Sequence, residues 1–436
     1  MTVRSSSGCS EFTTLTRRRL LSGGVASAAS LALWSGTPKA AIAGTRDPRL
    51  LTMILRGGLD GLSMIAPVGD PDYQRLRQKI ALQVPGSEAN AGLPLDAFFV
   101  LNPAMPFLHD LYKRREALAV HAISTPYRGR SHFDGQDVLE TGLGGVGRTD
   151  DGWLNRALAG LPSVGKSNPA GLEPGSTAKG LAMGAVVPLV MRGKAPVMSW
   201  IPKANGLELR DSTVARLMDL YGQTDPKLAR AFAQGMAIDR VDRAGSAMTA
   251  VLPKVPGAPT ATPRPFRDFI DTAETAAKFL SAADGPRIGT LSYNGWDTHA
   301  NEGAAVGQLA NRLAGLDAAI KAFADGMGAA WKDTVVIVVT EFGRTAAVNG
   351  SDGTDHGTAT AALLVGGAVN GGRIIADWPG LAPKNLYESR DLAPTCDLRT
   401  VLKGVLRDHL GVPTGALADL VFPASRAVAP TDGLIA

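Results

Sequence analysis

Three histidines of this chain stand beside acidic and small residues in segments that are typical of loops. The segments are Ser131-His132-Phe133-Asp134-Gly135, Trp296-Asp297-Thr298-His299 and Asp355-His356-Gly357-Thr358. Imidazole and carboxylate groups in one place are ligands that Zn²⁺, Mn²⁺, Mg²⁺ or Ca²⁺ accept in proteins. The segments therefore predict a divalent-cation site, although a His–Asp pair in a loop can also cap a turn and bind no metal.

The other histidines have different surroundings. His109 and His409 fall in stretches with helical spacing, and His121 lies within an apolar run that predicts a strand. We interpret all three as structural. The sequence contains no HExxH, CxxC or phosphate-binding loop motif, so the prediction of a metal site depends on the three loop segments together.

Short apolar runs separated by longer helical stretches must position these loops. The predicted strands are residues 50–55, 117–123, 288–293, 334–340 and 361–365. Runs that are apolar throughout are typical of strands covered on both faces of a parallel sheet. Residues 308–331 carry an apolar stripe at alternating steps of four and three, which predicts an amphipathic helix between two of these strands. This order predicts an α/β fold with helices on both faces of the sheet.

The loops beyond the carboxyl ends of parallel strands form one crevice. Residues 131–136 and 295–301 follow predicted strands, as do residues 56–61 and 341–344. We therefore expect these loops to converge with the segment around His356.

The middle of the chain has another composition. Residues 162–180 and 252–266 are rich in Pro, Gly and Ser, which predicts surface loops or linkers. Residues 211–221 and 227–251 between them have helical spacing. We therefore predict a mostly helical insertion or cap over residues 203–284.

Residues 1–43 have the layout of a secretory signal. Arg17–Arg19 precede a weakly apolar run over residues 20–34, and Ala41-Ile42-Ala43 form a small-x-small cleavage pattern. Paired arginines before a weakly apolar core resemble a twin-arginine signal, with an uncleaved anchor or an ordinary export signal as the alternatives. We expect a mature domain over residues 44–436 without a permanent membrane span, located in the periplasm or outside the cell.

Charge and cysteine content exclude some functions. The chain has 45 basic and 40 acidic side chains, but residues 1–43 hold five of the former and one of the latter, so the remainder has a net charge of only +1. A nucleic-acid partner is therefore not expected. Cys9 lies in the signal segment, which leaves Cys396 alone and excludes an intramolecular disulfide in the mature chain.

An ordered series of motifs carries a resemblance over essentially the whole chain. The motifs are the arginine signal, LRGGLDGLSMIAP, GRSHFDGQDVLETG, GWDTHAN, VVTEFGRT and DGTDHGTA. Together they resemble the bacterial family catalogued as domain of unknown function 1501, which in turn is similar to the alkaline phosphatase and sulfatase superfamily. That resemblance implies a three-layer αβα sandwich with divalent metals beside a nucleophile.

The resemblance also implies roles for single residues. The implied metal ligands are Asp60, Asp297, His299, Glu341, Asp355 and His356. Phe342 stands where the superfamily has a histidine ligand, and its ring cannot coordinate a metal. Ser131 or His132 falls at the place of the nucleophile, with Ser131 one residue out of register. The implied anion-binding residues are Arg56, Arg128, Arg130 and Arg344, which could equally be solvated loop charges.

Two functions remain open from the sequence. The first is an exported metal-dependent hydrolase of phosphate or sulfate esters, acting on a small molecule or a glycan through Ser131 or a water molecule. The second is a non-catalytic envelope protein of the same fold that binds a glycan or a co-exported partner protein. The Phe342 departure and the shifted serine favour the second, whereas the acids and histidines of the loops favour the first.

Overall fold

The computed structural model describes residues 46–161, 180–200 and 264–436, apart from residues 88, 148, 185 and 284. The predicted signal segment of residues 1–43 lies outside the described residues. Residues 162–179, from the first predicted loop or linker, also lie outside the described residues. The same holds for residues 203–263 of the predicted insertion. The insertion's last part is described and forms the helix α9 (Arg264–Ser281).

A nine-stranded sheet forms the centre of the described structure, in the order β11-β5-β10-β9-β1-β8-β6-β7, with β12 paired to β5. Its strands are β1 (Arg49–Arg56), β5 (Ala117–Ser124), β6 (Gly180–Met183), β7 (Val197–Trp200), β8 (Ile288–Asn294), β9 (Thr334–Thr340), β10 (Thr360–Val365), β11 (Arg373–Ile375) and β12 (Cys396–Asp397). All five strands predicted from apolar runs belong to it. Their backbones are buried because helices cover both faces.

Of the described strands in this sheet, only β10 runs antiparallel to its neighbours β5 and β9. No helix separates β9 from β10, and a direct return of this kind reverses the chain. The amino end of β10 therefore lies at the edge where its neighbours have their carboxyl ends. This reversal brings the segment before β10 to the same edge as the loops after β1, β5, β8 and β9.

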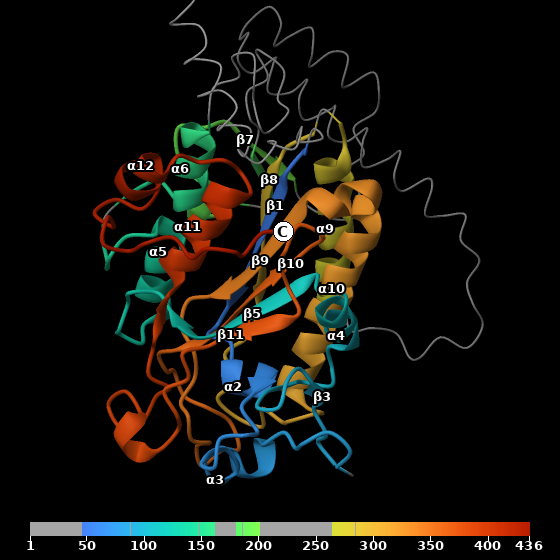
Figure 1. The fold of residues 1–436 in the computed structure, drawn as a ribbon, viewed down its shortest axis with the longest axis vertical. Coiled ribbons are helices and arrows are strands. Elements are labelled where there is room, and N and C mark those ends of the chain that lie inside the picture. Colours follow the sequence, from blue (N-terminus) through green and yellow to red (C-terminus); the bar gives the residue numbers. More distant parts are fainter. Residues whose placement is uncertain are drawn as a thin grey trace, which may run out of the picture. The chain divides into compact units, whose positions relative to one another are not determined.

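Helices cover the two faces of the sheet (Figure 1). One face carries α4 (Pro106–Lys113), α9 and α10 (Gln308–Met327), and the other carries α5 (His132–Thr141), α6 (Trp153–Gly160) and α11 (Leu398–Asp408). Alternate residues of β1 face opposite layers, since Leu51 belongs to the α9–α10 core and Leu50 to the α6–α11 core. The prediction of an αβα sandwich is confirmed.

The helix predicted over residues 308–331 is confirmed to Met327, and its apolar stripe is buried. Gly328 follows with a φ of 51°, a conformation that favours glycine, and a 3₁₀ turn continues to Asp333. Helix α9 lies beside α10, and both contribute to one hydrophobic core on the sheet. The described part of the predicted insertion is thus a layer helix of the sandwich.

A smaller region lies beyond the sheet edge, at the lower end of Figure 1. It contains α2 (Gly61–Met64), α3 (Tyr73–Arg77) and a three-stranded sheet of β2 (Ile65–Ala66), β4 (Val100–Leu101) and β3 (Leu93–Pro94). The remaining short elements are η1 (Gln78–Ile80), η2 (Leu189–Met191), η3 (Gly328–Asp333), η4 (Pro383–Asn385), α12 (Thr414–Ala416) and η5 (Leu417–Val421).

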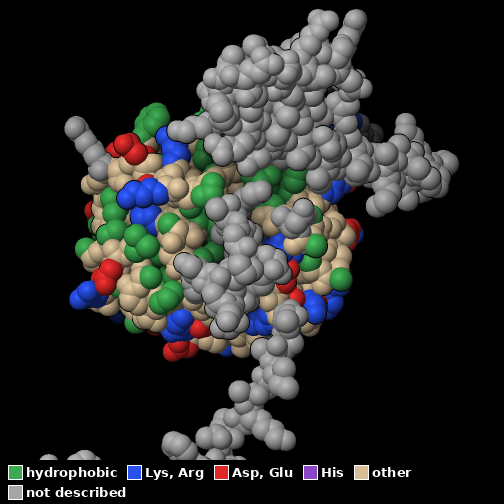
Figure 2. Space-filling view, turned by 90° about the horizontal axis from the view of Figure 1, so that it is seen from above, with side chains coloured by type: hydrophobic (Ala, Val, Ile, Leu, Met, Phe, Trp, Pro, Cys, Tyr) green, Lys and Arg blue, Asp and Glu red, His purple; other side chains and the backbone are tan. Residues whose placement is uncertain are grey.

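The three histidines interpreted as structural each hydrogen-bond to a backbone carbonyl. The Nε2 atoms of His109, His121 and His409 lie 2.8 to 2.9 Å from the carbonyls of Pro94, Ile65 and Arg49, respectively. Basic and acidic side chains are interspersed on the face seen in Figure 2, outside the grey atoms. Among the described residues, no helix combines the length and the apolar character needed to cross a bilayer.

Candidate metal centre

The site lies at the edge of the sheet where the carboxyl ends of β1, β5, β8 and β9 meet. His132 is the first residue of α5 and enters from the β5 side, and Asp297 and His299 come from the loop after β8. Glu341 follows β9 directly. His356 reaches this edge because β10, which it precedes, is reversed. The convergence expected from the sequence therefore occurs.

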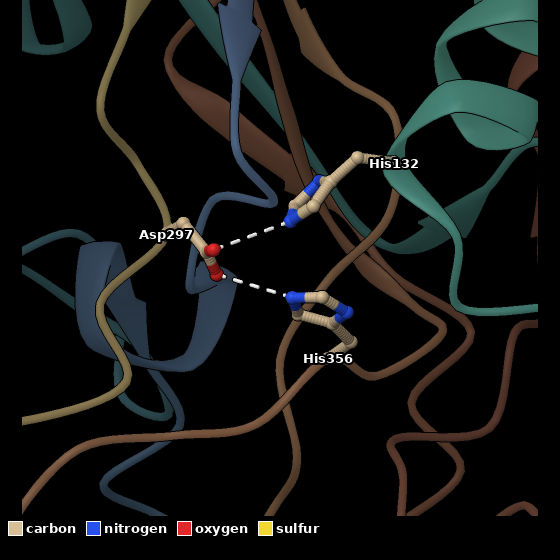
Figure 3. Close-up of side chains that lie close together, drawn as sticks. All are labelled: His132, Asp297 and His356. Atoms are coloured by element: carbon tan, nitrogen blue, oxygen red, sulfur yellow. Dashed lines mark hydrogen bonds and ion pairs between the residues drawn. The ribbon is translucent and has the colours of Figure 1, made fainter.

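Three side chains direct ligand atoms at one point (Figure 3). His132 Nε2 lies 3.3 Å from Asp297 Oδ2, and His356 Nε2 lies 3.2 Å from Asp297 Oδ1. The three ligand atoms all lie within 4.8 Å of one another. One carboxylate and two imidazoles at this separation form a candidate divalent-cation site.

The Nδ1 atoms of both rings face acceptors. His132 Nδ1 lies 2.9 Å from Glu341 Oε1, and His356 Nδ1 lies 2.8 Å from the carbonyl oxygen of Arg130. Neither oxygen can donate a hydrogen bond, because Glu341 is ionised and the other is a carbonyl. Each neutral ring therefore carries its proton on Nδ1 and presents the Nε2 lone pair to the site.

Glu341 supports His132 from behind instead of joining the ligand atoms. Its carboxylate is fully buried and also accepts hydrogen bonds from the Gly57 amide at 2.8 Å and from Gln136 Nε2 at 3.2 Å. Burial raises the pKa of Glu341, but the hydrogen bonds from His132 and the other donors outweigh it and lower the pKa below its usual value. The same hydrogen bond is the main cause of the raised pKa of His132. Glu341 was expected to be a metal ligand. In the structure it instead hydrogen-bonds to the imidazole of a candidate ligand, His132.

Two glycines allow the loops to approach closely. Gly57 has a φ of 124°, and a Cβ there would lie 2.6 Å from the backbone nitrogen of Asp297. A Cβ on Gly353 would lie 2.4 Å from the backbone of His299. A larger side chain at Gly57 would separate the loop after β1 from the loop that carries Asp297, and one at Gly353 would separate the loops that carry Asp297 and His356.

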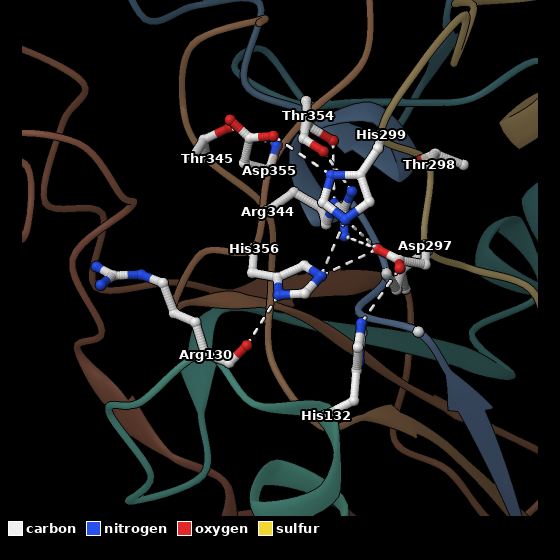
Figure 4. A network of polar contacts seen from close by, with 12 residues as sticks. Arg130, His132, Asp297, Thr298, His299, Arg344, Thr345, Thr354, Asp355 and His356 are labelled. Atoms are coloured by element: carbon white, nitrogen blue, oxygen red, sulfur yellow. Dashed lines mark hydrogen bonds and ion pairs between the residues drawn. The ribbon is translucent and has the colours of Figure 1, made fainter.

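His299 lies beside the three ligands (Figure 4). Its Nε2 is 3.0 Å from Asp297 Oδ1 and 3.1 Å from His356 Nε2, and its Nδ1 is 3.3 Å from Asp355 Oδ1. If both rings carry their protons on Nδ1, two lone pairs face each other across 3.1 Å. This contact is favourable only when a proton or a cation lies between the nitrogens.

Arg344 fixes Asp297 from inside the protein. Its guanidinium is buried and lies 2.5 Å from Asp297 Oδ1, and it also donates to the hydroxyl of Thr354 at 3.1 Å. Partial burial raises the pKa of Asp297, but the hydrogen bond and the charge of Arg344 outweigh it, so the pKa is lowered. Asp297 is therefore an oriented anion at neutral pH.

Asp60 has other partners. It caps α2 by accepting from the Leu62 amide at 3.0 Å, bonds to the Ser63 hydroxyl at 3.1 Å and pairs with the guanidinium of Arg77. Asp60 and Arg77 are both buried, and Arg77 lies 3.6 Å from a second buried carboxyl group, that of Glu302. The structure thus places Asp60 in a buried ion cluster and not among the ligand atoms.

Glu302 was missed by the sequence interpretation. Its Oε2 accepts hydrogen bonds from the hydroxyls of Thr298 at 3.0 Å and Thr354 at 2.7 Å. These threonines adjoin Asp297 and Asp355, so Glu302 joins the two loops that carry the site. Burial and the nearby charge of Asp60 raise the pKa of Glu302 to about 8. The only feature of the sequence that pointed to Glu302 was its position in the same loop as Asp297 and His299.

Ser131, the predicted nucleophile, also hydrogen-bonds within the protein. The Ser131 hydroxyl accepts from the backbone amide of Asp134 at 3.5 Å and so caps α5. The structure therefore gives this hydroxyl a role in starting the helix that carries His132.

The other predicted anion-binding arginines also have partners. Arg56 contacts Glu140 and Gln136, and Arg130 pairs with Glu388 at 2.6 Å and Asp391 at 2.9 Å. Arg128 donates to the Ser124 hydroxyl and the Thr125 carbonyl. Of the four arginines, Arg344 contacts a candidate ligand through its side chain, and Arg130 does so through its carbonyl.

Comparisons with known proteins give a family and two structures of similar fold. The family model described as "Protein of unknown function (DUF1501)" matches residues 116–420. One similar structure is Ps i-CgsB in complex with k-i-k-neocarrahexaose, at 12% identity and a TM-score of 0.41, covering 88% of this chain and 75% of that chain. Another is the phosphonate monoester hydrolase of Agrobacterium radiobacter, at 11% identity and a TM-score of 0.35, covering 84% of this chain and 74% of that chain. No curated protein matches the sequence.

Proposed function

We propose that this chain, which belongs to the family described as "Protein of unknown function (DUF1501)", is a divalent-cation-dependent hydrolase of phosphate or sulfate esters. The match over residues 116–420 confirms the expectation from the sequence that the chain belongs to this family. The observation that carries the proposal is the convergence of His132 Nε2, His356 Nε2 and the Asp297 carboxylate on one point.

The two contacts of the Asp297 carboxylate with the imidazoles have a spacing that suits a bound cation. Ligand atoms around a tetrahedral ion with bonds near 2.0–2.1 Å are about 3.3–3.4 Å apart. The contacts of Asp297 with His132 and His356, at 3.3 and 3.2 Å, match this spacing. His132 Nε2 is buried and has no hydrogen-bond partner among the described residues. Two nitrogens and one carboxylate favour Zn²⁺ or Mn²⁺ over Mg²⁺ or Ca²⁺.

The residues around the candidate ligands have positions that suit hydrolysis of an ester. A divalent ion held there would polarise an ester oxygen and lower the pKa of a bound water molecule. Glu341 holds the His132 ring, and Arg344 holds the Asp297 carboxylate. His299 has a half-exposed side chain and is placed to hydrogen-bond to the ester. Because the Ser131 hydroxyl caps α5, we assign the attack to water and not to Ser131.

One observation favours the non-catalytic alternative. Phe342 is buried, and its ring centroid lies 4.9 Å from that of His132 and 5.1 Å from that of His356. An apolar wall at this point leaves fewer polar groups for a reaction. In this alternative the same centre would hold a metal that supports binding of a glycan or a co-exported partner protein.

Export through the twin-arginine pathway to the periplasm completes the proposal. It is supported by the arginines at residues 17–19 and by the cleavage pattern at residues 41–43. Proteins on this route leave the cytoplasm folded, so a metal centre built from distant loops could be filled before export.

Metal analysis and an ester panel test the proposal. Protein purified without chelator should retain close to one equivalent of a divalent ion and hydrolyse an aryl phosphate or an aryl sulfate. His356→Ala and Asp297→Ala should lower metal content, thermal stability and hydrolysis together, because an ion bound only to the folded state stabilises that state.

His109→Ala is the matched control, since His109 hydrogen-bonds to the Pro94 carbonyl and lies outside the ligand set. It should retain metal and activity. Protein that retains no ion and gains no stability from Zn²⁺, Mn²⁺, Mg²⁺ or Ca²⁺ would refute the metal centre. Metal retention without hydrolysis of any ester would favour the non-catalytic alternative.

A further inference from the structure

Two adjoining clefts lie beside the candidate metal centre. The first, of about 650 Å³, is lined by residues from α5 and from the ends of β1, β6 and β8. The second, of about 300 Å³, extends towards α9. They share Met183, Gly184, Ser292 and Asn294. We treat them as one groove that crosses the ends of β6 and β8 from α5 to α9.

The groove and the metal centre are built on the same elements. Phe133, in the groove wall, directly follows the candidate ligand His132 on α5. Asn294 ends β8, three residues before Asp297. Gln136, also in the wall, donates to Glu341, which holds the His132 ring. A molecule in the groove therefore lies beside the proposed reaction centre.

Phe133 is unusual among the lining residues. Its side chain is 85% exposed, whereas large aromatic side chains are normally covered. No packing role accounts for an aromatic ring in this position, and such a ring offers a flat apolar surface to a ligand. Exposed polar side chains surround it in the groove, among them Asp137, Arg192 and Asn294.

The charges of the groove nearly cancel. Arg56 is paired with Glu140, and the groove has one further base, Arg192, and two further acids, Asp137 and Asp268, so its formal net charge is −1. A groove with so small a net charge gives little attraction to a highly charged polymer. Amide, carboxylate, guanidinium and hydroxyl groups beside an apolar ring match a ligand with hydroxyl groups at its rim and C–H groups on its faces.

We propose that this groove binds an oligosaccharide, with one sugar ring stacked on Phe133 and the chain continuing over Asn294 towards α9. The elongated form of the groove, from α5 to α9, fits several linked rings better than a single one. The proposal rests on the proposed function in one respect only: the sugar stacked on Phe133 is the one whose ester would reach the metal centre.

Binding of uncharged sugars without metal tests the groove separately from the hydrolase. The full chain, in EDTA, is titrated with cellohexaose, maltohexaose, xylohexaose, mannohexaose and a galactohexaose by calorimetry and by saturation-transfer NMR. At least one sugar should bind, and Phe133→Ala and Asn294→Ala should each weaken it by about tenfold or more. Val84→Ala is the control, since Val84 is 54% exposed and does not line the groove.

Each outcome decides the proposal. Sugar binding that depends on Phe133 and Asn294 supports it even if no metal binds, in which case the proposed function fails and the groove stands. Failure of all five sugars to bind, or binding that both variants leave unchanged, overturns it even if aryl esters are hydrolysed. Binding of a casein peptide mixture that depends on Phe133, without sugar binding, also overturns it and assigns the groove to a peptide.

Discussion

The Nδ1 atom of His132 lies 2.9 Å from Oε1 of Glu341, although 209 positions separate the two residues in the chain. This contact sets the proton on Nδ1 and leaves Nε2 to face Asp297. The buried carboxylate behind the imidazole is thus part of the candidate site without being a ligand.

Glu341→Gln should weaken binding of Zn²⁺ by about 10- to 100-fold, because the neutral amide no longer orients and polarises the His132 ring. Competition with a chromogenic chelator measures the affinity. Asp325→Asn is the control, since it removes an exposed carboxylate that pairs with Lys321 on α10. Equal affinities of Glu341→Gln and the wild type would show that Glu341 does not support the metal.

Ser131→Asn should leave both stability and ester hydrolysis close to the wild type. Asparagine caps a helix about as well as serine, so the start of α5 is preserved while the hydroxyl is removed. Ser131→Ala should lose about 1 kcal/mol of stability, measured by urea unfolding. Loss of hydrolysis in Ser131→Asn with retained metal would identify Ser131 as the nucleophile and contradict attack by water.

Arg77→Met should destabilise the fold by about 3–5 kcal/mol, because it leaves the buried carboxyl groups of Asp60 and Glu302 without their cation. Arg75→Met, on the same helix, removes an exposed pair with Asp72 and should change the free energy of unfolding by less than about 1 kcal/mol. Urea denaturation at neutral pH measures both. Similar values for the two variants would contradict the buried cluster.

Two buried histidines should each lower the stability of the fold as the pH drops from 6.5 to 4. Burial lowers the pKa of His121 and of His409 to about 4, so the unfolded chain takes up these protons before the folded chain does. Each histidine then lowers the free energy of unfolding by about 3 kcal/mol at pH 4. In His409→Gln the difference in unfolding free energy between pH 7 and pH 4 should shrink by that amount, whereas in His109→Gln it should match the wild type.

Replacing Arg17, Arg18 and Arg19 with lysine should trap the precursor in the cytoplasm, since the twin-arginine route requires the arginine pair. Fractionation followed by immunoblotting measures the distribution. Arg4→Lys, outside the cluster, serves as the control and should be exported. Unchanged periplasmic protein in the triple variant would rule out this route.

Local patterns in the sequence determined the architecture. Residues 117–123 and 334–340 could be identified as covered strands because every residue in them is apolar or small, apart from threonines and His121. The stripe of residues 308–327 determined a helix with one buried face. The loops that carry His132, Asp297 and His356 could be identified because they adjoin these strands. Such features depend on neighbours a few positions apart, so the sequence displays them directly.

Tertiary structure decided the role of each side chain. Asp60 resembled a metal ligand in sequence, but the fold places Arg77 against it, and Arg77 also meets Glu302, more than 200 positions further along. The reversal of β10 decided that His356 meets Asp297. Glu341 became the support of His132 because β9 ends and α5 begins at the same edge. These pairings depend on strand order and direction, which many distant contacts set together, and no local pattern encodes them.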